Sequence, residues 1–435
     1  MCGIVAVTGY KKALPLLMNG LEKLEYRGYD SAGIAIVNSE TKNITCNKAE
    51  GKLKNLIKNL NDKNMPGTVG IGHTRWATHG KPEIKNAHPH TNSSGTIAVV
   101  QNGIIENFQD LKNKLQKEGV IFNSDTDTEV IPHLIQRELN TLSKLNLDKN
   151  GSTLLVAVRN VISDLEGSYA LAVLWADAPT ALVVARRQAP LIIGLGEGEF
   201  ICASDTPAIA NFTNIILPME DEEIALLTPL GIEIYDSNNE RQYRSPVSLK
   251  VSEQIMDKMN FKHYMLKEIY DQPETAKNWL KNYLIKNLEN GQYQINYPFD
   301  TKFFESIERI EIIACGTSKH AAMVGRFLLE QFSGIPTNVF YASEFRYSPP
   351  PLLPNTLTIG VTQSGETADT IAAIDMEIKR RSSKVDKKYT PNLIAITNRK
   401  ESSIGRQVLN IIAVSYTHLR AHETPEHLVW RVGLE

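Results

Sequence analysis

The sequence predicts an α+β layered sandwich over its first half, followed by an α/β domain with a parallel sheet. Short apolar runs rich in Val and Ile fill the first half, with amphipathic helical patterns among them but no repeated βαβ rhythm. From Ile307 onward, strand, small-residue loop and helix alternate. That alternation is typical of parallel strands joined by right-handed crossovers.

Strands and helices of the first half follow from hydrophobic pattern. Five Val- and Ile-rich runs bounded by turn residues predict strands: Gly3–Gly9, Ser31–Asn38, Thr96–Gly103, Tyr169–Trp175 and Ala181–Arg187. Several lack polar alternation, so we expect both faces of the sheet to be covered. Apolar residues near one face predict helices over 13–28 and 127–139. Residues 222–236 predict a closing hairpin around Pro229 to Gly231.

The domain boundary is expected between residues 240 and 300. A polar, turn-rich linker follows Asp236, and residues 255–288 are expected to be mainly helical with a break near Pro273. The second domain is expected to contain helices over 319–332 and 368–381. These patterns place the first domain at 2–235, a linker and helical segment at 236–300, and the second domain at 301–414.

Composition limits the class of protein. The chain has 435 residues, 42% hydrophobic and 22% charged, with a formal net charge of −2. We therefore expect a soluble protein that binds neither nucleic acid nor an anionic membrane. Four scattered cysteines favour a reducing cytoplasm over a disulfide framework or a metal site. No secretory signal is visible, because Lys11 and Lys12 follow the first apolar run instead of preceding it.

Cys2, directly after the initiator methionine, is a candidate nucleophile. If Met1 is removed, Cys2 carries a thiol and a free α-amine on one carbon. The α-amine has an ordinary pKa of about 7.7–8.0, so it can act as the base that the thiol needs. This is the N-terminal-nucleophile arrangement. The alternative is an incidental small residue at position 2.

Three further runs carry candidate binding groups. In GHTRWATHG (Gly72–Gly80) an arginine, with nearby Thr and His, suits a carboxylate, although an exposed polar turn is the alternative. In QNGIIENF, Asn102 and Gly103 could donate to an oxyanion or form a plain turn. In SDTDTE, Asp125 or Asp127 could cap the next helix or pair with a substrate ammonium group. An α-amino acid with an acyl side chain would satisfy the whole set, and glutamine is the obvious candidate.

These motifs resemble the glutaminase domain of class II amidotransferases. The resemblance rests on MCGIVAV, LEYRGYDSAG, GHTRWATHG, NAHPH, QNGIIEN and DTDTE, in that order. Within that class the chain is similar to the isomerizing glutamine–fructose-6-phosphate aminotransferases. The resemblance implies an N-terminal-nucleophile αββα sandwich, no cofactor, L-glutamine and fructose 6-phosphate as substrates, and a role in amino-sugar synthesis in the cytoplasm.

The same resemblance implies a role for each motif residue. Cys2 would form a γ-glutamyl thioester with its own amine as general base, and Asn102 and Gly103 would stabilise the oxyanion. Trp76 would gate the passage of ammonia toward the second domain. Four residues would bind glutamine: Arg75, Thr78 and His79 at the α-carboxylate and Asp127 at the ammonium group.

Two hydroxyl-rich loops in the second domain, Cys315–Ser318 and Thr362–Thr367, are candidate phosphate-binding loops. Each lies between a strand and a helix N-terminus, where unpaired N–H groups attract anions, although plain helix capping is the alternative. Neither matches a dinucleotide or P-loop fingerprint. CGTS, ASEFRY, QSGETADT and HYMLKEIYDQP resemble the sugar-isomerase (SIS) half of the same family. The resemblance implies a sugar-phosphate site made of Thr317, Ser318, Thr362, Gln363, Ser364 and Thr367.

The resemblance ends near Ala413, and residues 415–435 are expected to be a non-native tail on an incomplete SIS domain. We therefore expect glutamine hydrolysis without glucosamine 6-phosphate synthesis, and the homo-oligomer that the family implies is in question. Three tail histidines lack metal-ligand spacing: His418, His422 and His427. Two alternatives stay open, another class II amidotransferase and a non-catalytic sugar-phosphate-binding regulatory module.

Overall fold

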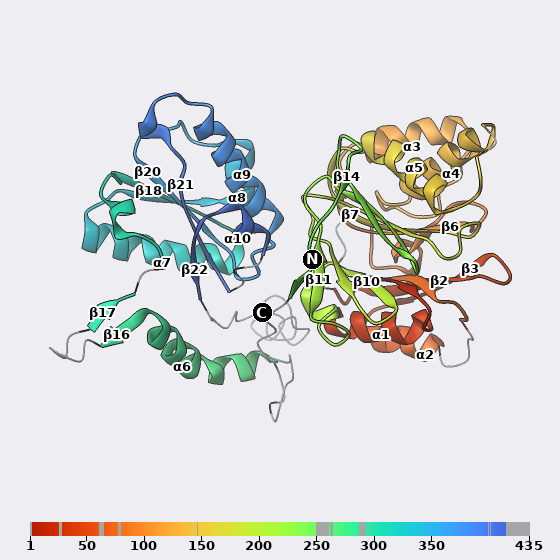
Figure 1. Ribbon diagram of the computed structural model, residues 1–435, viewed down its shortest axis with the longest axis horizontal. Helices are drawn as coiled ribbons and strands as arrows, with labels where there is room; N and C mark the ends of the chain where they lie inside the picture. The colour runs from red at the N-terminus through yellow and green to blue at the C-terminus, as the bar shows by residue number, and fades with distance from the viewer. Residues whose placement is uncertain are drawn as a thin grey trace, which may run out of the picture. The chain divides into compact units, whose positions relative to one another are not determined.

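The computed structural model describes residues 2–25, 28–60, 65–76, 80–145, 147–248, 261, 264–286, 293–296, 298–398, 400 and 402–414. The chain forms two compact units, Met1–Met256 and Asp257–Glu435 (Figure 1). Over the described residues, no helix combines the length and the apolar character needed to cross a membrane.

Two antiparallel sheets form the centre of the first unit. In spatial order, the first sheet contains β15 (Val247–Ser248), β11 (Ile215–Pro218), β9 (Ile192–Leu195), β10 (Glu199–Ala203), β1 (Gly3–Gly9), β4 (Val69–Arg75), β2 (Ser31–Asn38) and β3 (Asn43–Glu50). The second contains β14 (Arg241–Gln242), β13 (Gly231–Tyr235), β12 (Ile224–Thr228), β8 (Leu182–Arg187), β7 (Gly167–Trp175), β6 (Ile97–Ile105) and β5 (His90–Thr91).

Helices cover the outer face of each sheet, so the unit is an αββα sandwich (Figure 1). The first sheet is covered by α1 (Ala13–Leu24) and α2 (Leu53–Leu60), and the second by α3 (Phe108–Lys117), α4 (Val130–Ser143) and α5 (Gly151–Ser163). Alternate residues of β1 belong to different cores: Ile4 packs between the sheets and Val5 packs on the α1 side. Both faces are therefore covered, as the missing polar alternation predicted.

The predicted strands and helices of the first unit are confirmed. The hairpin is confirmed as well, because β12 and β13 pair antiparallel from Ile224↔Tyr235 to Thr228↔Gly231. Several elements were not predicted, including β3, α2, α3, α5 and β9 to β11. The first unit also extends beyond residue 235, because β14 and β15 add short pairings to β13 and β11.

The second unit contains a parallel sheet with helices on both faces, as the alternation of strand, loop and helix predicted. Its strands, in spatial order, are β19 (Thr337–Tyr341), β18 (Arg309–Ala314), β20 (Thr356–Val361), β21 (Asn392–Thr397) and β22 (Asn410–Ala413). One face is covered by α7 (Gly316–Ser333), and the other by α8 (Ala342–Tyr347), α9 (Ala368–Ser382) and α10 (Ser403–Gln407).

Before this sheet the chain forms α6 (Tyr264–Tyr283) and a small pairing of β16 (Leu284–Lys286) with β17 (Tyr293–Ile295). The predicted break near Pro273 is wrong, because α6 continues through this residue. Proline removes one N–H from the helix ladder without preventing helix on both sides of it. The short 3₁₀ turns of the chain are Ile84–Asn86, Thr206–Ala208, Thr301–Phe304 and Lys387–Tyr389.

Candidate active site

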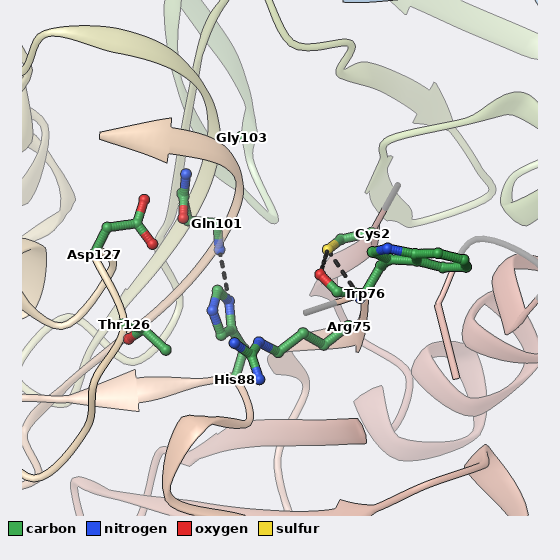
Figure 2. Close-up of a pocket in the computed structure, with 8 residues that line it drawn as sticks. All are labelled: Cys2, Arg75, Trp76, His88, Gln101, Gly103, Thr126 and Asp127. Carbon is green, nitrogen blue, oxygen red and sulfur yellow. Dashed lines mark hydrogen bonds between the residues drawn. The ribbon is translucent and has the colours of Figure 1, made fainter. Parts of the chain in front are cut away.

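The candidate site lies where β1 begins, because the sheet register brings distant residues to this point. The pairing Gly3↔Thr74 places Cys2 beside the end of β4, where Arg75 and Trp76 follow. The Trp76 N–H donates to the Cys2 Sγ at 3.2 Å, and the thiol donates to the Trp76 carbonyl at 3.4 Å (Figure 2). The thiol is therefore held at one defined position.

Burial raises the pKa of the Cys2 thiol, and the Trp76 N–H and the Arg75 charge offset part of that effect. The thiol is accordingly protonated near neutral pH. Because the thiolate is the nucleophilic form, any attack by Cys2 requires a base.

Asn102 and Gly103 lie inside β6 and not in a turn, so the turn alternative is wrong. The Asn102 Nδ2 donates to the Cys2 carbonyl at 3.1 Å. Gly103 has a φ of +104°, and a Cβ at this position would clash with the Ser168 carbonyl. A glycine is therefore required where β6 and β7 approach each other beside Cys2.

A pocket with about 250 Å³ of unfilled space, part of it open to solvent, connects these groups. It is lined by Cys2, Arg75, Trp76, His88, Gln101, Gly103, Thr126 and Asp127. Figure 2 shows Cys2 and Trp76 on one side and Thr126 and Asp127 on the other, with Arg75 and His88 between them. The pocket thus combines a thiol, a guanidinium and a carboxylate.

Arg75 is 3% exposed, so the exposed-turn alternative is wrong for this residue. Its guanidinium donates to the carbonyls of Gly80 and Lys81, both at 3.3 Å. Burial lowers the pKa of Arg75, but a guanidinium stays protonated in proteins. A buried positive charge in the pocket suits a carboxylate ligand. Thr78 and His79, predicted beside it, lie outside the described residues.

Asp127 is buried, and its Oδ2 accepts the Ile105 N–H at 2.8 Å. Asp125 forms an ion pair with Lys85 at 2.8 Å. The N-cap position of α4 is occupied by Glu129, which makes no side-chain cap bond, so the capping alternative is wrong for both aspartates. Asp127 instead lines the pocket and accepts a hydrogen bond from the last residue of β6.

Glu129 anchors the loop that carries Asp127. Its carboxylate accepts the N–H groups of Asn123 at 2.8 Å and Ser124 at 2.6 Å, and the Ser124 hydroxyl at 2.6 Å. Burial alone would raise its pKa, but His133 and these hydrogen bonds outweigh that effect and lower the pKa to about 2. Glu129 is therefore ionised near neutral pH.

The pocket residues that sequence reasoning did not assign are His88, Gln101 and Thr126. The Gln101 N–H donates to the His88 Nδ1 at 3.2 Å, so the His88 Nε2 carries the proton and donates to the Thr128 hydroxyl at 3.3 Å. Thr128 in turn donates to the Gln101 side-chain oxygen at 2.5 Å. The motif NAHPH, with His88 and His90 at alternate positions, could have indicated His88 as a site residue.

In the second unit, the two predicted loops lie at the same edge of the sheet. Parallel pairing of Ala314 with Val361 brings the strand ends together, and the Thr370 hydroxyl donates to the Cys315 Sγ at 4.0 Å. Of the predicted residues, Thr317 and Ser318 lie in the first turn of α7, while Thr362, Gln363, Ser364 and Thr367 span the end of β20 and the N-cap of α9.

Hydrogen bonds hold the second of these loops in shape. The Thr362 and Thr367 hydroxyl oxygens are 2.7 Å apart, and the Ser364 hydroxyl accepts the Glu366 N–H at 3.1 Å. Glu366 also accepts both the N–H and the hydroxyl of Ser403, at 2.9 and 2.6 Å. The described residues contain no group of three His, Cys, Asp or Glu side chains arranged for a metal ion. His418, His422 and His427 lie outside them.

Comparison with known proteins defines the class first. A glutamine amidotransferase domain model matches residues 73–211, and a SIS domain model matches residues 303–420. A solved glutamine phosphoribosylpyrophosphate amidotransferase from B. subtilis covers 91% of this chain and 81% of its own, at 17% identity and a TM-score of 0.48. The two domain models thus place an amidotransferase domain and a SIS domain in the chain.

Curated relatives define the family. The glutamine–fructose-6-phosphate aminotransferase [isomerizing] of Thermosynechococcus vestitus is 53% identical over 95% of this chain and 65% of its own length. The one from Clostridium tetani is 42% identical over 98% of this chain and 67% of its own length. The chain belongs to the family of isomerizing glutamine–fructose-6-phosphate aminotransferases. It spans about 65% of the length of several of these relatives.

Proposed function

We propose that the first unit hydrolyses glutamine through a γ-glutamyl thioester on Cys2. The observation that carries the proposal is the position of the Cys2 thiol, which is hydrogen-bonded to Trp76 at a pocket that also contains Arg75 and Asp127. A nucleophile, an anion-binding group and a cation-binding group are the parts that an amino-acid amide requires.

The proposed chemistry begins after removal of Met1. The Cys2 α-amine takes the thiol proton, and sulfur attacks the side-chain amide carbon of glutamine. The Asn102 Nδ2 and the Gly103 N–H stabilise the resulting oxyanion. The protonated α-amine of Cys2 gives the proton to the amide nitrogen of glutamine. The C–N bond of the amide then breaks, and ammonia leaves. Water then attacks the thioester by the same route and releases glutamate.

Glutamine recognition is assigned to groups around the pocket. Arg75, with Thr78 and His79, binds the α-carboxylate, and Asp127 binds the ammonium group. A guanidinium can donate two parallel hydrogen bonds to one carboxylate, which fixes the direction of the ligand. Trp76 is proposed as the gate for ammonia, since its backbone already contacts the Cys2 sulfur and its ring packs edge-on against Tyr29 at 5.4 Å.

For the second unit we propose a fructose 6-phosphate site at the shared loop edge. Hydroxyl and backbone N–H groups at two helix N-termini suit a phosphate group. The ligands are assigned to Thr317, Ser318, Thr362, Gln363, Ser364 and Thr367. The family reaction, glutamine-dependent formation of glucosamine 6-phosphate, is the overall activity to which both sites would contribute. Four free cysteines support a cytoplasmic location.

The test uses the whole chain with its N-terminus verified by mass. Wild-type protein should release glutamate and ammonia from glutamine, and hydroxylamine should intercept the thioester as γ-glutamyl hydroxamate. Cys2→Ala and a form retaining Met1 should lose both products, while Cys46→Ala, a change in β3, should keep them. Wild-type rates from Cys2→Ala would refute the nucleophile, and wild-type rates from the form retaining Met1 would refute the amine as base. Adding fructose 6-phosphate and assaying amino sugar tests the overall reaction separately.

A further inference from the structure

A buried histidine outside the assigned machinery contacts the proposed oxyanion donor. His73 lies on β4, opposite Ile4 of β1 and Gly33 of β2, and is fully buried. Its Nε2 is 3.0 Å from the Asn102 Oδ1. His73 therefore contacts the Oδ1 of Asn102, whereas Cys2 contacts its Nδ2.

The orientation of the Asn102 amide follows from its two neighbours. The Cys2 carbonyl can only accept, so the Nδ2 must face it, which leaves the Oδ1 toward His73. An amide oxygen can only accept, so the proton of the His73 ring must be on Nε2. Among the described residues the His73 Nδ1 has no hydrogen-bond partner, so a proton there would be a buried, unsatisfied donor.

The His73 ring is itself held in place. It stacks on His88, with centroids 4.2 Å apart and planes 21° apart. Gln101 and Thr128 bond the two nitrogens of His88 and so fix that ring. Burial lowers the pKa of His73 to about 3, so the ring is neutral and has a single N–H to donate.

We propose that His73 is a positioning residue that holds the Asn102 amide with its Nδ2 directed at Cys2. One hydrogen atom on the Asn102 Nδ2 is donated to the Cys2 carbonyl, and the second Nδ2 hydrogen atom is directed to an oxyanion formed on the substrate. Without the His73 donor, the Cys2 carbonyl is, among the described residues, the one contact that still orients the amide, so the amide can more easily rotate and present its oxygen to the developing negative charge. This inference rests on the proposed glutaminase function.

The first test compares two substitutions. His73→Phe keeps an aromatic ring against His88 but removes the donor, and we expect kcat to fall roughly 10-fold, the factor that one buried hydrogen bond is typically worth. KM for glutamine should change less than twofold, because Arg75 and Asp127 are untouched. His73→Gln restores a donor at the position of Nε2 and should recover most of kcat. His320→Phe, the same substitution on α7 of the second unit, is the control and should keep wild-type kcat.

A double-mutant cycle separates positioning from general damage. Asn102→Ala should lower kcat by roughly 10²-fold. If His73 acts through Asn102, adding His73→Phe to Asn102→Ala should cause no further loss, whereas multiplication of the two losses would overturn the proposal. If Cys2→Ala and Asn102→Ala are both as active as wild type, the proposed function has failed, and the His73 inference fails with it.

The protonation state of His73 can be measured on the wild-type chain, so this test does not depend on whether the variants fold. Nitrogen-15 NMR of the His73 ring should show a neutral imidazole protonated on Nε2 between pH 6 and 8. A ring protonated on Nδ1, or a charged ring, would overturn the proposal even if every variant were too unstable to assay.

Discussion

Protonation of Glu129 is expected to destabilise the loop that carries Asp127. The Glu129 side chain is 3% exposed and accepts three hydrogen bonds from the backbone and hydroxyl groups of Asn123 and Ser124. Its pKa in the folded chain is about 2, against an ordinary value of 4.5. That difference corresponds to about 3 kcal/mol of stability contributed by the ionised form.

The sign of the pH dependence follows from the lowered pKa. Well above pH 4.5 the carboxylate is ionised in both the folded and the unfolded state, and its full contribution to the free energy of unfolding is present. As pH falls from about 5 toward 2, the unfolded chain takes up the proton first, so the contribution is lost. Glu129→Gln should therefore be about 3 kcal/mol less stable than wild type at pH 7, and the gap should shrink steadily below pH 5.

The assay is native-state hydrogen exchange of buried amides in β6, which reports on the first unit alone. Glu118→Gln is the matched control, because Glu118 is half exposed and pairs with Arg137 at the surface. This control should lie within about 0.5 kcal/mol of wild type at every pH. A gap between wild type and Glu129→Gln that stays constant from pH 7 to pH 3 would refute the reasoning.

Three further predictions concern the packing and charge of the two units. Gly33→Ala places a methyl group against the His88 carbonyl and should cost about 1–3 kcal/mol by thermal unfolding, whereas Gly325→Ala, which meets open space, should not destabilise. Arg75→Lys keeps the positive charge but loses the guanidinium group that donates to two backbone carbonyls. KM for glutamine should therefore rise at least 10-fold, with a smaller change in kcat. An unchanged KM would contradict the proposal that Arg75 binds the α-carboxylate. Burial, with Glu377 nearby, raises the pKa of Glu311. Glu311→Gln should therefore raise the free energy of unfolding above that of wild type by more at pH 7 than at pH 4. An equal effect at both pH values would contradict the cost of burying the charged Glu311.

Much of the fold could be predicted because its strands are covered on both faces. β1 is buried along its whole length, and such a strand appears in the sequence as a continuous apolar run. The strand-to-helix loops at Ala314 and Val361 were visible for the same reason. Among the elements that were not predicted, β3 is more exposed than β1, and a helix through Pro273 requires support that sequence pattern does not report.

Part of the candidate site could also be predicted, because motif and resemblance pointed to Cys2, Arg75, Asn102 and Asp127 before any fold was known. The alternatives at these positions could not be decided from spacing. Whether Asn102 and Gly103 formed a turn depended on their pairing with β7, and whether Asp127 capped α4 depended on the Ile105 N–H. Both are contacts that only the folded chain makes.

The amino-acid sequence by itself determined the order of buried strands, the candidate nucleophile Cys2 and the hydroxyl-rich loops of the second unit. The tertiary structure alone decided which groups support them. His73 meets Asn102 across 29 residues of sequence, and Asn102 meets Cys2 across 100. The physical reason is sheet register: side chains become neighbours when their strands pair or pack, and nothing in local sequence states which strands will do so.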